Sequence, residues 1–123
     1  MHHPSTIRRH NLRAELFARD GTFNLGTGEP VTFPKGYQVG GYTTPLVNPT
    51  PDAIDGWLFR VKRLQVAPRY VGSWTAPDGT RYIDASQWFE DRAEALNAAS
   101  VRGEQAIWDW ANDESINVVT LDT

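Results

Sequence analysis

The chain has 123 residues, no cysteine and a formal net charge of −3, with 40% hydrophobic and 22% charged residues. The length fits one domain, and the hydrophobic content excludes a disordered chain. The absence of cysteine excludes disulfides, thiolate nucleophiles and cysteine-ligated zinc. No apolar run reaches the roughly 18 residues that span a bilayer, and the first residues contain no apolar signal core, so we expect a cytoplasmic protein without a membrane contact.

Charge is unevenly distributed along the chain. Residues 60–83 carry five basic residues against Asp78, and residues 84–123 carry nine acidic residues against Arg92 and Arg102. Such segments are either an ordinary solubilising surface or basic and acidic faces that steer a partner. The acidic C-terminal third disfavours nucleic acid as the partner but does not exclude it, because a local basic patch can suffice.

Residues 1–20 are expected to form an N-terminal tail or a short helix, and residues 21–123 a single domain. Leu12, Leu16 and Phe17 follow helical spacing, which favours one or two amphipathic turns in the first segment. All three histidines lie within the first ten residues, which is typical of a solvated tail, with adventitious metal capture as the alternative.

The next region has the pattern of irregular β structure. Segments 23–25 and 31–33 alternate apolar with polar residues around a turn sequence that contains glycine and proline, which predicts a short hairpin. Residues 37–42 are a further strand candidate. Their glycine pair, Gly40 and Gly41, indicates a bulge or a close backbone approach.

A helix is predicted from Pro51, because Thr50 can cap its N-terminus and Asp52 favours the positive end of its dipole. One face of this helix, over 51–64, is apolar and expected to be buried: Ile54, Trp57, Leu58, Val61 and Leu64. Its basic residues fall elsewhere: Arg60, Lys62 and Arg63.

The C-terminal half has the pattern of hairpin, helix and hairpin. Strands over 70–75 and 80–85 flank a strong turn sequence, and Asp91 with Glu94 forms a capping-box pattern for a helix that ends at Gly103. Two further strands follow, over 105–110 and 115–119. We therefore expect a single α+β domain, with a mixed or mainly antiparallel sheet of about four to six strands and two helices packed on one of its faces.

Several short motifs are shared with a known group of proteins: Tyr70-Val71-Gly72-Ser73-Trp74, Pro77-Asp78-Gly79, Tyr82-Ile83-Asp84, Glu94-Ala95 and Ala106-Ile107-Trp108-Asp109. Through them, residues 70–118 resemble small uncharacterised proteins of actinobacteria and their phages, and residues 27–41 are similar to the N-terminal region of these proteins. The resemblance implies a phage or mobile-element context in a bacterial host. It implies no activity and no site residues.

Catalytic motifs are absent from the sequence. With every histidine in the first ten residues, no Ser-His-acid arrangement can be built, and neither HExxH nor a phosphate-binding loop occurs. Asp84 and Asp109 remain, because each lies in an expected strand beside aromatic residues. If those strands were neighbours, the two carboxylates could act in acid–base catalysis or bind Mg²⁺. Otherwise each accepts local hydrogen bonds at a strand end.

Aromatic side chains are a second candidate set. Trp88 and Phe89 are expected in a short connection of about five residues between the strand that ends near Ala85 and the second helix, where they either pack as an anchor or form a contact surface. Together with the basic residues they give the candidate interaction surface: Trp88, Phe89, Trp110, Arg60, Lys62 and Arg63.

These patterns favour a non-enzymatic accessory protein of a phage or mobile element that binds another macromolecule, in the first instance a protein. The alternatives are a metal-dependent enzyme that uses Asp84 and Asp109, and a nucleic-acid-binding module that uses the basic helix with Arg69. We expect no cofactor and no bound metal. Homo-oligomerisation is left open by the sequence.

Overall fold

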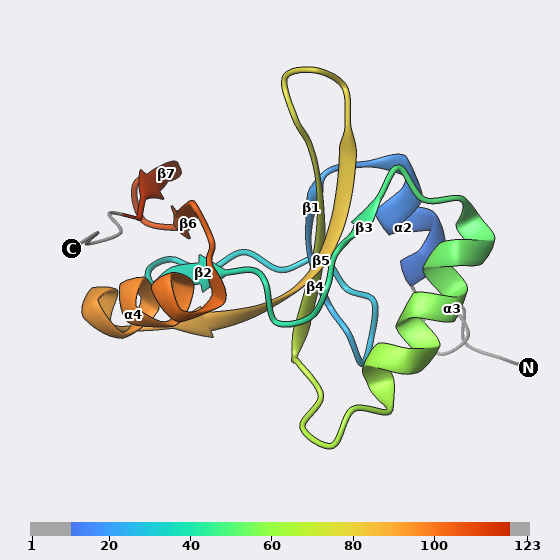
Figure 1. Cartoon of the computed structure of the whole chain (residues 1–123), viewed down its shortest axis with the longest axis horizontal. Helices are drawn as coiled ribbons and strands as arrows, with labels where there is room; N and C mark the ends of the chain where they lie inside the picture. The colour runs from blue at the N-terminus through green and yellow to red at the C-terminus, as the bar shows by residue number, and fades with distance from the viewer. Residues whose placement is uncertain (1–10, 119–123) are drawn as a thin grey trace, which may run out of the picture.

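Strand β5 (Arg81–Phe89) joins the two halves of the fold in the computed structural model, which describes residues 11–118 (Figure 1). The other elements, in chain order, are α2 (Leu12–Ala18), β1 (Gly21–Asn24), β2 (Tyr37–Val39), β3 (Leu46–Val47), α3 (Pro51–Lys62), β4 (Tyr70–Thr75), α4 (Arg92–Arg102), β6 (Ala106–Asp109) and β7 (Glu114–Asn117). The described residues therefore form an α+β domain, as the sequence predicts.

All strand pairs are antiparallel, and the strand order is β1-β4-β5-β2-β6-β7, with β3 also paired to β5. The first six residues of β5, Arg81 to Ser86, pair with β4, and the last three, Gln87 to Phe89, pair with β2. Figure 1 shows β5 curving from the half that holds α2 and α3 to the half that holds α4. A nine-residue strand thus serves two smaller sheets.

Two hydrophobic cores lie against the same face of β5. Ile83 and Ala85 belong to the core that α2 and α3 cover, and Phe89 packs against the core under α4. Because alternate residues of a strand point to the same face, these three side chains share one side of the sheet. The opposite face carries the alternate residues, among them Trp88.

The helix signals in the sequence act as predicted. Thr50 accepts a hydrogen bond from the Ala53 amide at the start of α3, and Asp91 accepts one from the Glu94 amide at the start of α4. Gly103 ends α4 in the left-handed conformation with φ 73°, which residues with a Cβ atom adopt only at a cost.

The expected hairpin between 23–25 and 31–33 forms only in a short version that begins earlier in the chain. The Asn24 amide donates to the Glu29 carbonyl at 2.8 Å and the Val31 amide donates to the Thr22 carbonyl at 2.9 Å, around an antiparallel bridge from Phe23 to Pro30, while β1 pairs along its whole length with β4. Turn-rich segments carry weak register information, and the longer β4 offers more backbone partners. The sequence also gave no indication of β3, whose two residues pair with β5 only because the fold brings them there.

For residues 1–20 the sequence predicted either a tail or a short helix, and the described part of this segment contains the short helix α2. Its Leu12 and Leu16 are buried in the core with α3. A third helix therefore joins the two predicted ones. The three histidines and the expected strand residue Val119 lie outside the described residues.

Candidate functional site

The end of α3 and the loop that follows it form the most strongly basic surface segment of the described chain. We call residues 59–69 the basic patch. It contains no acidic residue and four basic ones: Arg60, Lys62, Arg63 and Arg69. All four are exposed, and within residues 11–118 none of them forms an ion pair with a carboxylate. Their charge is therefore available to a partner.

Large apolar side chains are exposed among these cations. Phe59 is 57% exposed, Leu64 41% and Val66 72%. The sequence predicted Leu64 on the buried face of the helix, which is wrong: α3 ends at Lys62, so the helical spacing no longer directs residue 64 inward. Ile54, Trp57, Leu58 and Val61 are buried, as predicted.

Local contacts hold the basic patch in shape. The Arg63 guanidinium lies over the Phe59 ring at 3.6 Å from its centroid, a cation–π contact. The Tyr42 hydroxyl donates to the Val66 carbonyl at 2.7 Å, which ties the loop to the segment after β2. The apolar and basic groups are thus presented on a loop that these two contacts anchor.

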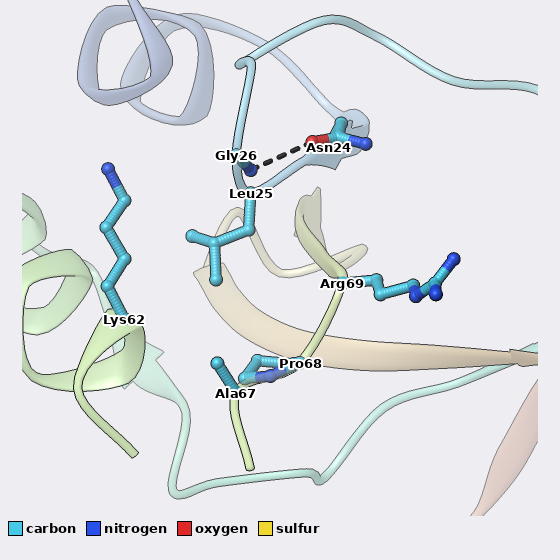
Figure 2. A pocket seen from close by; sticks show the side chains of 7 residues that line it. All are labelled: Asn24, Leu25, Gly26, Lys62, Ala67, Pro68 and Arg69. Atoms are coloured by element: carbon cyan, nitrogen blue, oxygen red, sulfur yellow. Dashed lines mark hydrogen bonds between the residues drawn. The ribbon is translucent and has the colours of Figure 1, made fainter. Parts of the chain in front are cut away.

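A depression of about 500 Å³ borders the patch (Figure 2). Its lining residues are Asn24, Leu25, Gly26, Lys62, Ala67, Pro68 and Arg69. Figure 2 shows the Lys62 and Arg69 side chains on opposite sides of Leu25 and Pro68, pointing apart. The two cations therefore border an open concave surface and do not converge on one small anion.

The structure does not bring Asp84 and Asp109 together. Asp109 lies opposite Tyr37, which itself lies opposite Phe89, whereas Asp84 lies opposite Gly72. Phe89 lies five residues further along β5 than Asp84, about 16 Å of strand. Within residues 11–118 no group of three or more histidine, cysteine or acidic side chains is placed to hold a metal ion.

Asp109 has a local structural role. Its carboxylate accepts hydrogen bonds from the Asn112 side chain at 2.8 Å and from the amides of Ala111 and Asn112, which closes the turn between β6 and β7. The hydrogen bond from the Asn112 side chain is the main cause that lowers the pKa of Asp109.

The carboxylate near Asp84 is that of Glu104, which the sequence interpretation missed. A Cβ atom on Gly40 would lie 2.5 Å from Asp84 Oδ2 and 3.0 Å from Glu104 Oε1, so both carboxylates pack on the backbone of this glycine. Burial is the main cause that raises the pKa of Asp84 to about 6, and it also raises the pKa of Glu104. In the sequence, the pair of Gly40 and Gly41 indicated that some group approaches the backbone closely at this point, but it did not indicate that this group is a pair of carboxylates.

Trp88 and Trp110 meet in a half-buried aromatic cluster around Phe33. The Phe33 ring stacks on Trp88 at 5.3 Å and meets the edges of Trp110 at 5.5 Å and Tyr70 at 5.4 Å. Trp110 also donates through Nε1 to Gln38 Oε1 at 3.1 Å. These contacts hold the 33–36 segment on the sheet.

The sequence predicted Trp88 and Phe89 in a short connection between a strand and the second helix, and this prediction is wrong. Both lie within β5, paired with Gln38 and Tyr37, and only Glu90 and Asp91 separate the strand from α4. The sequence could not show this extension because the pairing partner lies about 50 residues away. The proposed interaction surface is thus split between the basic patch, the Phe33 cluster and the core under α4.

A further apolar row lies on the helix-free face of the sheet. Trp74 is 52% exposed and stacks on Tyr82 at 4.9 Å, and Val47 lies opposite Tyr82 on the next strand. No charged side chain belongs to this row, so nothing in it specifies the chemistry of a partner.

Among the helices of residues 11–118, none is long and apolar enough to cross a bilayer. Comparisons of the chain with protein-family models, with curated proteins and with solved structures found no match.

Proposed function

We propose that this chain is a non-enzymatic binding protein that docks a partner protein with an acidic, partly apolar surface on the basic patch. The observation that carries the proposal is the combination within residues 59–69: four cations without a carboxylate partner in the described chain, interleaved with three exposed large apolar side chains. Unpaired surface cations steer an acidic partner, and apolar contacts supply the affinity.

The kind of apolar group favours a protein over a nucleic acid. Leu64 and Val66 are aliphatic and cannot stack on bases, and the one aromatic ring of the patch, Phe59, already has the Arg63 guanidinium on its face. The acidic half of the chain around α4 would in addition repel a long polyanion. Nucleic acid is therefore the second candidate partner. The observation that favours it is the group of four exposed cations in the basic patch.

The cellular setting remains part of the proposal. The resemblance of residues 70–118 to small actinobacterial and phage proteins implies a bacterial host cell and a phage or mobile element. A host protein in the cytoplasm is then the partner to seek.

Capture from a lysate of the native host, followed by purification of the candidate and calorimetry, tests the proposal. The double variant Arg60→Glu with Arg63→Glu should weaken binding at least tenfold, about 1.4 kcal/mol. The matched control, Arg92→Glu, makes the same kind of charge reversal at the exposed start of α4 and should leave the affinity unchanged. Equal affinities for the two variants would remove the basic patch from the interface.

A second measurement separates the two macromolecule classes. Fluorescence anisotropy with a labelled DNA duplex and a labelled single-stranded RNA, at about 150 mM salt, should give only weak binding. Submicromolar binding that the double variant abolishes would assign the patch to nucleic acid. Melting temperatures of all variants show whether folding is intact.

A further inference from the structure

The two halves of the sheet meet at a gap along β5. On the edge of β5 that faces away from β4, β3 pairs with Tyr82 and Ile83 and β2 pairs with Gln87 onward. Between them, one backbone hydrogen bond reaches this edge, from the Tyr42 amide to the Ala85 carbonyl at 3.2 Å. The chain between β2 and β3 must therefore be held to β5 by other groups.

The Asp84 carboxylate fills this gap. It accepts a hydrogen bond from the Gly41 amide at 2.7 Å through Oδ2 and one from the Ala85 amide at 2.9 Å through Oδ1. A side chain thus supplies the acceptors that a neighbouring strand would supply elsewhere in the sheet. The contact joins the segment after β2 to the middle of β5.

Glu104 brings a second carboxylate to the same place. A Cβ atom on Gly40 would lie 2.5 Å from Asp84 Oδ2 and 3.0 Å from Glu104 Oε1. These two oxygens are therefore at most about 5.5 Å apart, close enough for the two charges to interact. A Cβ atom on Gly41, whose φ is 73°, would lie 2.7 Å from Glu104 Oε2. Only glycines at both positions allow the two carboxylates to approach the backbone and each other.

Arg102 is the cation nearest the pair, but it is held by other acceptors. It donates to the carbonyls of Val39 and Gly40 at 3.5 and 3.3 Å and to Gln87 Oε1 at 2.6 Å. Within the described chain it forms no ion pair with either carboxylate, although its charge lowers both pKa values.

The remaining neighbours of the pair carry no charge that offsets its repulsion. The Tyr42 ring lies beside Arg102, at 5.4 Å from the guanidinium carbon, and the residue of β4 opposite Asp84 is Gly72. The β3 residues are Leu46 and Val47. Glu104 and Arg102 are therefore the charged groups that act on Asp84.

We propose that the Asp84 and Glu104 carboxylates form a proton-sensitive latch between the two halves of the sheet, which holds the Gly41 segment on β5 when one of them is protonated and loosens it when both are ionised. Two anions that share a partly buried site repel each other, and one proton removes the repulsion. No residue of the basic patch belongs to the latch. A result that contradicts the latch therefore leaves the proposed docking function untouched, and the reverse also holds.

The direction of the effect follows from the raised pKa. Burial is the main cause that raises the pKa of Asp84 from 3.8 to about 6, with the charge of Glu104 adding to it. The hydrogen bonds from the Gly41 and Ala85 amides and the charge of Arg102 lower this pKa but do not offset the rise, so the closed latch binds a proton more tightly than the open one. Its stability is therefore full below about pH 4 and is lost as the pH rises through about 6. Linkage with these two pKa values gives about a tenfold increase in opening from about pH 5 to about pH 7.5.

Amide hydrogen exchange, followed by NMR at about pH 5 and about pH 7.5, tests the latch. After correction for the intrinsic exchange rates, the protection factor of the Gly41 amide should fall about tenfold at the higher pH in the wild type. It should change little in Asp84→Asn, and in Glu104→Gln it should fall by less than in the wild type, because Asp84 stays buried there but loses the charge of Glu104. The matched control Glu114→Gln, on the exposed strand β7, should behave as the wild type.

An equal protection factor at both pH values in the wild type overturns the proposal. So does a full tenfold fall in Glu104→Gln, because that variant keeps Asp84 and its hydrogen bonds and removes only the second charge. If Asp84→Asn does not fold, Glu104→Gln and the wild type still decide the question.

Discussion

Trp88 packs directly on the backbone of Gly36, where a Cβ atom would collide with the indole Nε1. The same nitrogen donates to the Lys35 carbonyl at 3.0 Å, and the ring stacks on Phe33. Gly36 has φ 93°, a conformation that side chains with a Cβ atom rarely adopt. The indole and this glycine together hold the loop before β2 on the sheet.

Replacing Trp88 by alanine should therefore cost about 3 kcal/mol of the free energy of unfolding, because it removes the ring on which Phe33 and Gly36 pack. Trp74→Ala, at an exposed ring on the same face, should cost less than about 1 kcal/mol. Urea unfolding measures both, and size-exclusion chromatography gives the oligomeric state. A small loss for Trp88→Ala together with a change in oligomeric state would instead support the contact role that the sequence suggested.

Arg81 joins α2 to the hairpin of β4 and β5. Its guanidinium donates to Asp20 Oδ1 at 2.7 Å, to the Thr75 hydroxyl at 2.9 Å and to the Leu16 carbonyl at 2.5 Å. Arg81→Ala should destabilise the protein by about 1–3 kcal/mol, since it takes the donor from the part-buried Leu16 carbonyl and removes the ion pair with Asp20.

A matched comparison uses the exposed pair of Arg13 and Asp55, at 3.0 Å on the outside of the two helices. Arg13→Ala removes one surface ion pair and should cost less than about 1 kcal/mol. Thermal unfolding at low and high salt measures both variants. Equal losses for Arg81→Ala and Arg13→Ala would show that the contacts of Arg81 contribute no more than an ordinary surface charge.

The turn of Asp109 should respond to pH in the opposite direction to the Asp84 latch. Hydrogen bonds from Asn112 lower the pKa of Asp109 in the folded protein, so its stabilisation is present above the ordinary value of 3.8 and is lost as the pH falls through the lowered one. Asn112→Ala removes the strongest of these hydrogen bonds. The stability difference between this variant and the wild type should be larger at about pH 6 than at about pH 3, measured by urea unfolding. A difference that does not change with pH would contradict the assigned role.

Local signals in the sequence determined the helices and turns. Thr50 and Asp91 cap α3 and α4, and Gly103 ends α4, because each acts on backbone groups within a few residues of itself. The apolar spacing of α3 also identified its buried face as far as Val61. The candidate cations could also be identified from the sequence, because the charge of a lysine or arginine does not depend on which residues become its neighbours in the fold.

Pairings between distant segments were decided by the tertiary structure alone. The extension of β5 to Phe89 depends on β2, and the meeting of Asp84 with Glu104 depends on two glycines that neither residue is near in sequence. Strand register and the approach of two carboxylates depend on which backbones become neighbours after the chain has folded, and spacing along the chain does not encode that choice. The sequence by itself therefore determined the helices, the turns and the charged segments, whereas β3, the full length of β5, the sheet order and the carboxylate pair in the gap beside β5 arose only from the packing of the whole domain.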